Sequence, residues 1–510
     1  TLIGFLNINK KPSLHCDGSI RGSRVELTGT VMADAQNYIG GAWMAASSGG
    51  TIDVLSPSDG RVFSRIADGN AVDIDRAVRA ARASLSGEWG ATAPVDRGRI
   101  LSRLSALILA HADELADIEG RDTGKPMSQA RADIAACARY FEFYGGAADK
   151  LHGETIPYLK EYFVAVIREP HGVTGHIIPW NYPAQMFGRT LAPALATGNA
   201  TVLKPAEEAC LSCIRLTELA IEAGLPAGSL NLVTGFGATA GAALTAHPGI
   251  DFLSFTGSPE VGTMVQVASA EHHRPCVLEL GGKSPQIVFD DADFDAALPV
   301  VVAGIVQNSG QTCSAGSRVL VQKSIFGAFT AALAKRISNL VAGPHVKDLN
   351  CGPLISTKQL DRVQKFVTNA EANGLSCLAR AKLDRDAPDT GFYVAPALYG
   401  PVPETDDLAQ REVFGPLLAA IPFDDEADAI QIANDTDFGL VAGVWTNNGG
   451  RQMRMANNLR CGQVFINNYG AGGGVELPFG GVKHSGHGRE KGFSAMHEFT
   501  VTKTIVLKHT

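Results

Sequence analysis

Short apolar runs separated by longer amphipathic stretches organise the chain from residue 172 onward. The first five runs alternate with helical stretches of about ten to fifteen residues, and this rhythm predicts a parallel, doubly wound α/β sheet. The predicted strands are 173–178, 200–203, 230–233, 252–255 and 277–279. Ligands of such sheets bind beyond the carboxyl ends of the strands, where this chain has polar or glycine-containing turns. A nucleotide is therefore the expected occupant of that edge.

A second series of apolar runs follows the glycine-rich segment LGGKSP, which begins at Leu280. Helical patterns separate these runs, so they predict a second α/β lobe. The runs are 286–289, 318–321, 417–421, 441–445 and 463–466. Two other strand-like segments, 158–168 and 501–507, fall outside both lobes, and we expect them to pair as an edge used between subunits.

Two stretches that precede the lobes carry apolar side chains at three- and four-residue spacing. The segments 73–84 and 125–147 are therefore predicted to be helices, with Asp73 as the N-cap of the first. We expect both helices to form outer layers.

Length and charge narrow the class of protein. A chain of 510 residues is too long for one core, because single cores stop growing near ~250–300 residues. Apolar residues make up 45% and charged residues 19%, the balance of a globular protein. The net charge of −8, from 44 basic and 52 acidic side chains, argues against a nucleic acid or an anionic membrane as partner. A small-molecule substrate fits better.

Targeting and metal-binding signals are weak. No run approaches the roughly 18 apolar residues that span a bilayer, so no membrane anchor is expected. The apolar opening is followed by Lys10 and Lys11, the reverse of the charge order of a signal peptide. The nine cysteines do not form two CxxC pairs, so we expect no metal site and a reducing, cytoplasmic location.

Three residues are candidates for catalysis. Cys313 in NSGQTCSAGSR has small, polar neighbours that leave a thiol accessible, although most free cysteines are small buried apolar residues. Glu279 ends an apolar strand in VLELGGKSP, where a carboxylate is either a satisfied core group or a base with a raised pKa. Asn181 in IIPWNYP could donate to an oxyanion or could simply form a turn.

Other turns offer groups for a nucleotide. Lys204 and Glu207 in VLKPAEE could bind ribose hydroxyls, or could be a solvated surface pair. Gly257 and Ser258 are predicted to open a helix, whose free N–H groups would meet a pyrophosphate; an ordinary N-cap is the alternative. The glycine-rich turn at Gly237 lacks a full G-x-G-x-x-G and is weak evidence.

Seven motifs occur in the order and approximate spacing of the aldehyde dehydrogenase superfamily, and from Tyr38 onward the chain resembles its cysteine-dependent, hydrolytic members. The motifs are IIPWNYP, VLKPAEE, FTGSPEVG, LELGGKSP, GQTCSAGSR, EVFGP and LPFGGVKHSGHGRE. The resemblance implies oxidation of an aldehyde to a carboxylic acid with NAD, through a thiohemiacetal and a thioester on Cys313. By this resemblance Cys313 is the nucleophile, and Glu279 is the base that activates water. The Asn181 side chain and the Cys313 N–H donate hydrogen bonds to the oxyanion.

The resemblance also implies a set of cofactor contacts. Its members are Ile178, Trp180, Lys204, Glu207, Gly237, Phe255, Gly257, Ser258, Leu280, Glu412 and Phe414. A carboxylate at Glu207 accepts hydrogen bonds from a free 2′-hydroxyl and repels a 2′-phosphate, so NAD is expected in preference to NADP. Lys204 makes this a preference and not an exclusion.

Three-part architecture follows from the same resemblance. We expect an α/β protein with a Rossmann-type NAD-binding lobe, an α/β catalytic lobe and a small β arm for oligomerisation, assembled as a homodimer or homotetramer. The expected bounds are 36–147 and 171–281 for the NAD-binding lobe, 282–482 for the catalytic lobe, 148–170 and 493–510 for the arm, and 1–35 for an N-terminal segment.

Substrate residues are indicated by departures from the family pattern. Thr190 stands where many members have lysine, and Pro259 replaces a common threonine at a position where a helix tolerates proline. Arg189 resembles the arginine that semialdehyde-type members use for a carboxylate, with a surface arginine as the alternative. Glu476, in a glycine-rich loop, could face a cation such as an aminoaldehyde or betaine aldehyde. The other substrate candidates are Tyr182 and Phe479.

Other readings of the chain remain. A non-catalytic scaffold would have lost the thiol or the base, and neither is lost. A Cys–His hydrolase would need a histidine beside Cys313, for which His171 and His176 are the candidates. Transfer of the acyl group to coenzyme A is the remaining variant, and the retention of Glu279 favours hydrolysis instead.

Overall fold

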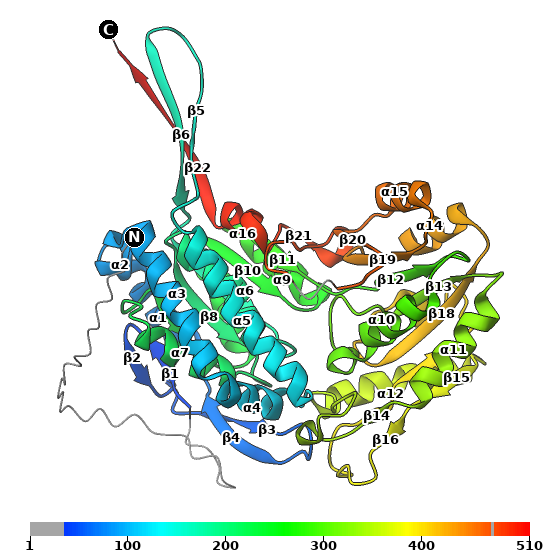
Figure 1. Cartoon of the computed structure of the whole chain (residues 1–510). Helices are drawn as coiled ribbons and strands as arrows, with labels where there is room; N and C mark the ends of the chain where they lie inside the picture. The colour runs from blue at the N-terminus through cyan, green and yellow to red at the C-terminus, as the bar shows by residue number, and fades with distance from the viewer. Residues whose placement is uncertain (1–34, 471–473, 510) are drawn as a thin grey trace, which may run out of the picture.

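The computed structural model describes residues 35–470 and 474–509. Two α/β lobes lie side by side, and a long β arm projects from the lobe that contains the N-terminal half of the chain (Figure 1). The expected N-terminal segment, apart from Ala35, and part of the glycine-rich loop before Glu476 lie outside the described residues. None of the described helices is both long and apolar enough to cross a membrane.

The first lobe is built on a sheet whose five inner strands are parallel. In the described part of the chain its order is β2 (Ala42–Met44), β1 (Asn37–Ile39), β9 (Leu230–Leu232), β8 (Ala200–Pro205), β7 (Val173–Ile178), β10 (Phe252–Thr256), β11 (Cys276–Glu279) and β21 (Gly486–His487). The five predicted strands are confirmed, and they are the parallel ones. The edge strands β1, β2 and β21 pair antiparallel and are too short to give an apolar run.

Helices cover this sheet and share its core. They are α1 (Ala71–Ser84), α2 (Glu88–Ala91), α3 (Pro94–Ala110), α4 (Ala112–Thr123), α5 (Met127–Ala147), α6 (Pro183–Ala196), α7 (Leu211–Glu222), α8 (Ala242–Ala246), α9 (Pro259–Glu271) and α16 (Gly492–Glu498). Helix α5 packs on α6, where the rings of Phe141 and Phe187 lie 6.0 Å apart.

Two helix starts differ from the prediction. Asn70, not Asp73, is the N-cap of α1; Asp73 occupies the third helical position and its carboxylate accepts from the Asn70 N–H at 3.1 Å, closing a capping box. Helix α5 begins at Met127, after Pro126, so Lys125 lies in the link between α4 and α5 and not in a helix.

The second lobe has a predominantly parallel sheet. Its described strands run in the order β15 (Cys377–Arg380), β17 (Ala397–Tyr399), β18 (Leu417–Phe423), β13 (Arg318–Gln322), β12 (Pro285–Val288), β19 (Val441–Trp445) and β20 (Gln463–Ile466). Successive side chains enter different cores: Ile287 packs on one face and Val288 on the other. The five predicted strands are confirmed; β15 and β17 form an edge that the sequence pattern missed.

Helices and small sheets complete the molecule. The helices of the second lobe are α10 (Phe294–Val306), α11 (Phe326–Ser338), α12 (Thr357–Ala372), α13 (Asp407–Gln410), α14 (Glu426–Asn434) and α15 (Gly449–Asn458). Two small pairings lie apart from the main sheets: β3 (Thr51–Leu55) with β4 (Val62–Ala67), and β14 (Val341–Ala342) with β16 (Lys382–Leu383).

The arm is a three-stranded sheet. Strand β6 (Tyr162–Pro170) pairs antiparallel with β22 (Thr500–Lys508) on one side and β5 (Glu154–Thr155) on the other, which confirms the expected pairing of the two stray segments. Part of the expected arm, 493–498, instead belongs to helix α16, because Ala495 and Met496 are buried in the core of the first lobe. The other domain bounds stay a prediction.

Candidate active site

One large cavity collects residues from both lobes. It has a volume of about 1430 Å³ and its wall includes Trp180 and Ser258 from the first lobe and Cys313, Glu412 and Phe414 from the second. Pockets for one small molecule are usually about 300–1,000 Å³. The cavity can therefore hold a large cofactor together with a small substrate.

Cys313 lies half-buried on the wall of this cavity, in the loop that leads to β13. Asn308 and Ser309, just before it, have φ of 47° and 56°, so the loop is held in a left-handed turn. Gly282 of LGGKSP permits this placement, since a Cβ there would lie 2.4 Å from the Cys313 carbonyl oxygen. Burial raises the pKa of the thiol to about 12, although Arg189 acts to lower it. The thiol thus needs a proton acceptor or a further cation to become a thiolate near neutral pH.

Glu279 ends β11 and faces the same cavity. Its side chain is 1% exposed, and neither carboxylate oxygen accepts a hydrogen bond from the described residues. Burial raises its pKa well above the ordinary value; Arg189 lowers this pKa and Glu490 raises it. The carboxyl group is therefore not a satisfied core group, and it has the properties of a general base.

Arg189 is buried, so the alternative of a surface arginine is wrong. It projects from α6 with 8% exposure and stacks its guanidinium 4.3 Å from the centre of the Phe479 ring on the cavity wall. Its Nε pairs with Glu490, and its Nη2 lies 3.5 Å from Glu279 Oε2. The guanidinium is therefore already engaged by two carboxylates of the protein.

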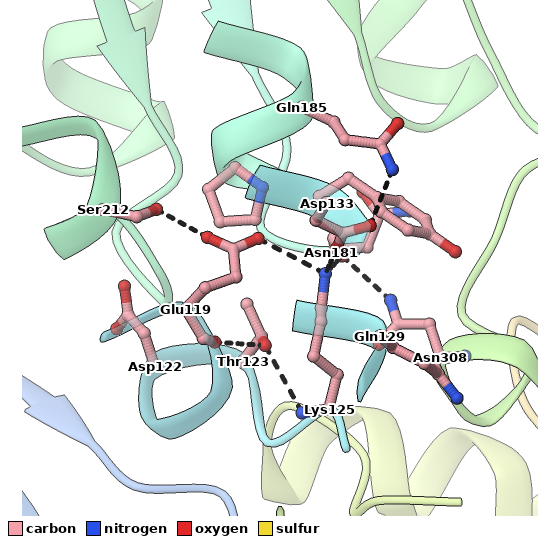
Figure 2. A network of polar contacts seen from close by, with 12 residues as sticks. Glu119, Asp122, Thr123, Lys125, Gln129, Asp133, Asn181, Gln185, Ser212 and Asn308 are labelled. Carbon is pink, nitrogen blue, oxygen red and sulfur yellow. Dashed lines mark hydrogen bonds and ion pairs between the residues drawn. The ribbon is translucent and has the colours of Figure 1, made fainter. Parts of the chain in front are cut away.

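Asn181 follows β7 and is tied to the nucleophile loop. Its side-chain amide donates to the Gln311 carbonyl at 2.9 Å, while its own backbone carbonyl accepts from Lys125 Nζ and Asn308 Nδ2, each at 2.9 Å (Figure 2). One amide hydrogen remains for another acceptor. The arrangement suits a donor to an oxyanion on a substrate bound to Cys313.

An aromatic pair joins the two lobes, and an acidic residue contacts the segment that links them. The rings of Trp180 and Phe414 meet edge to face at 5.4 Å. Glu412 accepts from the Gly282 N–H at 2.9 Å, and burial raises its pKa to about 7. Gly281 allows this approach, because a Cβ there would lie 2.4 Å from a Glu412 oxygen.

Other expected cofactor residues form a cluster beside the cavity. Lys204 Nζ lies 2.7 Å from Glu207, and the Gly237 N–H donates to the same carboxylate at 3.3 Å. Lys204 is 2% exposed, so the solvated-pair alternative is wrong for it. Pro259 is the first residue of α9, which confirms the predicted helix start; the Ser258 hydroxyl accepts from the Val261 N–H at 3.4 Å, as the alternative of an N-cap expects.

The expected cofactor set divides in two. On the cavity wall lie Trp180, Gly257, Ser258, Glu412 and Phe414. Outside that wall lie Ile178, Lys204, Glu207, Gly237, Phe255 and Leu280. Ile178, Phe255 and Leu280 are core side chains, so they could meet a ligand only through their main chain.

The substrate candidates also divide. Tyr182 and Phe479 line the cavity, and the Tyr182 hydroxyl shares a hydrogen bond of 2.7 Å with Thr312, next to the nucleophile. Glu476 lies outside the wall, where its carboxylate pairs with Arg139 at 2.5 Å. The placement expected for Glu476, facing a cation in the cavity, is not the one that the structure has.

Neither histidine proposed for a Cys–His hydrolase is beside the thiol. His171 Nε2 contacts the Glu498 carbonyl at 2.8 Å, and buried His176 lies between Thr174 and Thr190, with which it shares hydrogen bonds of 2.7 and 2.6 Å. The hydrolase alternative therefore has no support from the geometry.

Sequence reasoning missed three charged residues of the site. Glu490 was inside a quoted motif but had no assigned role, Lys491 follows it on the cavity wall, and Lys125 contacts Asn181 from behind. The motif LPFGGVKHSGHGRE was the one available signal for Glu490, because Glu490 is its last residue. A buried acid at that position needs a cation as its partner.

Comparisons with known proteins agree with one another. The model of the aldehyde dehydrogenase family matches residues 43–505. An aldehyde dehydrogenase of Emericella nidulans is 41% identical over 470 residues, which cover 92% of this chain and 94% of that protein. A crystal structure from Burkholderia cenocepacia, assigned to the aldehyde dehydrogenases, is 60% identical with a TM-score of 0.93 and covers 93% of this chain and 100% of its own. Betaine aldehyde dehydrogenase of Staphylococcus aureus, solved with NAD+, is 36% identical with a TM-score of 0.90, and the match covers 93% and 94% of the two chains. The predicted family and fold class are confirmed.

Proposed function

Because this chain belongs to the aldehyde dehydrogenase family, we propose that it oxidises an aldehyde to a carboxylic acid with NAD, through a thioester on Cys313. The observation that carries the proposal is the convergence of Cys313, Glu279 and the Asn181 amide on one cavity of about 1430 Å³. The cavity has room for an aldehyde beside a dinucleotide.

The chemistry follows from these groups. The Cys313 sulfur, as thiolate, bonds to the aldehyde carbon, and the carbonyl electron pair moves to oxygen, where the Asn181 amide and the Cys313 N–H donate to it. Bound NAD supplies the acceptor for the hydride that leaves this carbon as the C=O bond re-forms. Glu279 then takes a proton from water, whose oxygen adds to the thioester carbon. The C–S bond breaks, and the acid and the thiolate are released.

The cofactor side fits NAD. The 13-residue helix α9 begins at the cavity with Ser258 as its N-cap, so the positive end of the helix dipole lies where a pyrophosphate would bind. Glu412 and Glu207 provide carboxylates for ribose hydroxyls, and Glu207 disfavours a 2′-phosphate. The Staphylococcus aureus relative was solved with NAD+. Replacement of Glu207 by Gln is expected to narrow the preference for NAD over NADP.

A polar aldehyde is the favoured substrate class. The wall carries amide and hydroxyl groups from Gln129, Gln307, Gln463 and Tyr469. Gln129, Gln463 and Tyr469 each make one hydrogen bond within the protein and keep further donor or acceptor capacity for a substrate. The charged groups first considered for selection are otherwise engaged: Arg189 by two carboxylates, and Glu476 by Arg139. Selection by net charge is therefore expected to be weak, and selection by hydrogen bonding stronger.

The arm serves a second copy of the chain. Its exposed apolar side chains include Phe163, Ile505, Val506 and Leu507, and the matching hydrophobic surface of a partner subunit would cover them. A homodimer or homotetramer is expected, and multi-angle light scattering on the full chain distinguishes these states from a monomer. The cytoplasmic location expected from the free cysteines stays a prediction.

The test is NADH formation over an aldehyde panel that pairs succinic semialdehyde, 4-aminobutanal, betaine aldehyde and neutral aldehydes. Wild type is expected to turn over with NAD, and Cys313→Ala to lose activity. Glu279→Gln is expected to release one NADH per site and then stall at the thioester. Sustained turnover by Cys313→Ala would contradict the proposal, and turnover that requires added coenzyme A would replace hydrolysis by acyl transfer.

A further inference from the structure

A buried lysine stands behind the oxyanion donor. Lys125 occupies the link between α4 and α5, between Gly124, whose φ of 79° ends α4, and Pro126. Its side chain is 0% exposed. A fully buried ammonium is costly and is kept only where its partners are well placed.

Each N–H bond of this ammonium has an acceptor. Lys125 Nζ donates to Glu119 Oε1 at 3.3 Å, to Asp133, and to the backbone carbonyl of Asn181 at 2.9 Å (Figure 2). It also lies 4.4 Å from the centre of the Tyr182 ring. A lysine has three N–H donors, so the ammonium is fully used and has one orientation.

The two carboxylates are themselves fixed from neighbouring helices. Ser212 on α7 donates to Glu119 Oε2 at 2.6 Å, and Gln185 on α6 donates to Asp133 Oδ1 at 2.6 Å. The ammonium is thus located by four helices of the first lobe. A buried ion pair of this kind adds little net stability compared with apolar residues, but removal of one partner is costly.

On its other side the ammonium holds two consecutive residues of the cavity wall. Asn181 reaches the nucleophile loop through the Gln311 carbonyl, and Tyr182 reaches it through Thr312. We propose that Lys125 is a positioning residue of the oxyanion site: it fixes the main chain at Asn181 and the ring of Tyr182, and so the amide that stabilises the oxyanion. The inference rests on the proposed role of Asn181.

The test is a double-mutant cycle between Lys125→Met and Asn181→Ala, read as the rate of the first turnover of NADH formation in stopped flow. Lys125→Met alone is expected to slow this step by about 10- to 100-fold, less than the ~10²–10³-fold loss expected for an oxyanion donor. In the Asn181→Ala background the same change is expected to cost less than about threefold, because the two residues act as a unit. Affinity for NADH, measured by fluorescence, is expected to stay the same.

The control is Arg215→Met. Arg215 joins the same helices, α7 and α4, through Glu114 at 2.8 Å and touches none of the Lys125 partners. It is expected to lower the thermal midpoint and keep the first-turnover rate within about twofold. If Lys125→Met alone does not fold, the pair Lys125→Met/Glu119→Gln removes one charge of each sign and enters the same cycle.

Several outcomes overturn the inference. A wild-type first-turnover rate in Lys125→Met would do so, as would multiplicative effects of Lys125→Met and Asn181→Ala. A wild-type rate in Asn181→Ala itself would instead remove the oxyanion role of Asn181 from the proposed function. The two failures are therefore distinguishable.

Discussion

Two buried clusters of charged side chains flank the reaction centre. They differ in how completely their carboxylate oxygens are hydrogen-bonded. Around Lys125, Glu119 and Asp133 each accept from the ammonium and from a second side chain. Around Arg189, both oxygens of Glu279 and Oε2 of Glu490 lack an aligned hydrogen bond from the described residues, although the ion pairs are close. Asp133 borders the cavity, as Arg189 and Glu279 do, so the clusters differ in how completely their carboxylates are hydrogen-bonded and not in access to the cavity.

The difference teaches which buried charges are free to react. A fully hydrogen-bonded cluster has one arrangement, and any change of protonation breaks a contact. A partly satisfied carboxyl group can accept a proton from water at small structural cost, which a general base requires. We infer that the Lys125 cluster holds the oxyanion site in position, and that the Arg189 cluster controls the protonation of Glu279.

The largest effect is expected on stability, from Lys125→Met. The change leaves two buried carboxyl groups without their cation and is expected to lower the free energy of unfolding by about 3–5 kcal/mol. Lys125 lowers the pKa of both Glu119 and Asp133 against burial, so without it both pKa values rise further and the folded variant holds more protons, which it releases on unfolding. The loss of stability is therefore expected to grow as pH rises. Urea unfolding at several pH values measures this, and an equal loss in Arg189→Gln would remove the distinction between the clusters.

The next effect is on the pH profile, from Arg189→Gln. Arg189 lowers the pKa of Glu279 and of Cys313, so its removal raises both. Base and thiolate then form only at higher pH, and the acid limb of the pH profile of kcat is expected to move to the alkaline side. If Arg189 instead binds substrate carboxylates, KM rises for succinic semialdehyde alone and the limb stays in place.

Glu490→Gln is expected to move the acid limb of the pH profile of kcat in the opposite direction, to lower pH. Glu490 raises the pKa of Glu279, so its loss lets the base ionise at lower pH. The freed Arg189 side chain can then pair more closely with Glu279, which lowers the pKa of Glu279 further. Shifts of the same sign in Arg189→Gln and Glu490→Gln would show that these residues affect packing and not charge.

Apolar pattern predicted the inner strands of both lobes and missed parts that depend on distant partners. Strands such as β7 are buried on both faces and give continuous apolar runs, whereas the three residues of β1 give none. Motif resemblance found Cys313, Glu279 and Asn181. It did not find Lys125, because a lone lysine near a helical pattern looks solvated, and its burial depends on Asn181, 56 residues away. The resemblance also found Arg189. It did not find the partner of this arginine, Glu490, which lies 301 residues further along the chain.

The smallest effect on stability is expected at an exposed ion pair. Like the buried pairs, it joins a carboxylate to a cation. Glu476 and Arg139 are 2.5 Å apart with side chains 52% and 44% exposed, so Glu476→Gln is expected to cost less than about 1 kcal/mol of stability. Because the carboxylate lies outside the cavity wall, the ratio of kcat/KM for 4-aminobutanal to that for a neutral aldehyde is expected to stay within about twofold. Arg139→Gln is the matched control, since it breaks the same pair from the other side. A selective loss of aminoaldehyde turnover in Glu476→Gln but not in Arg139→Gln would place Glu476 at the substrate. An exposed residue, and not the buried clusters, would then select the substrate by its charge.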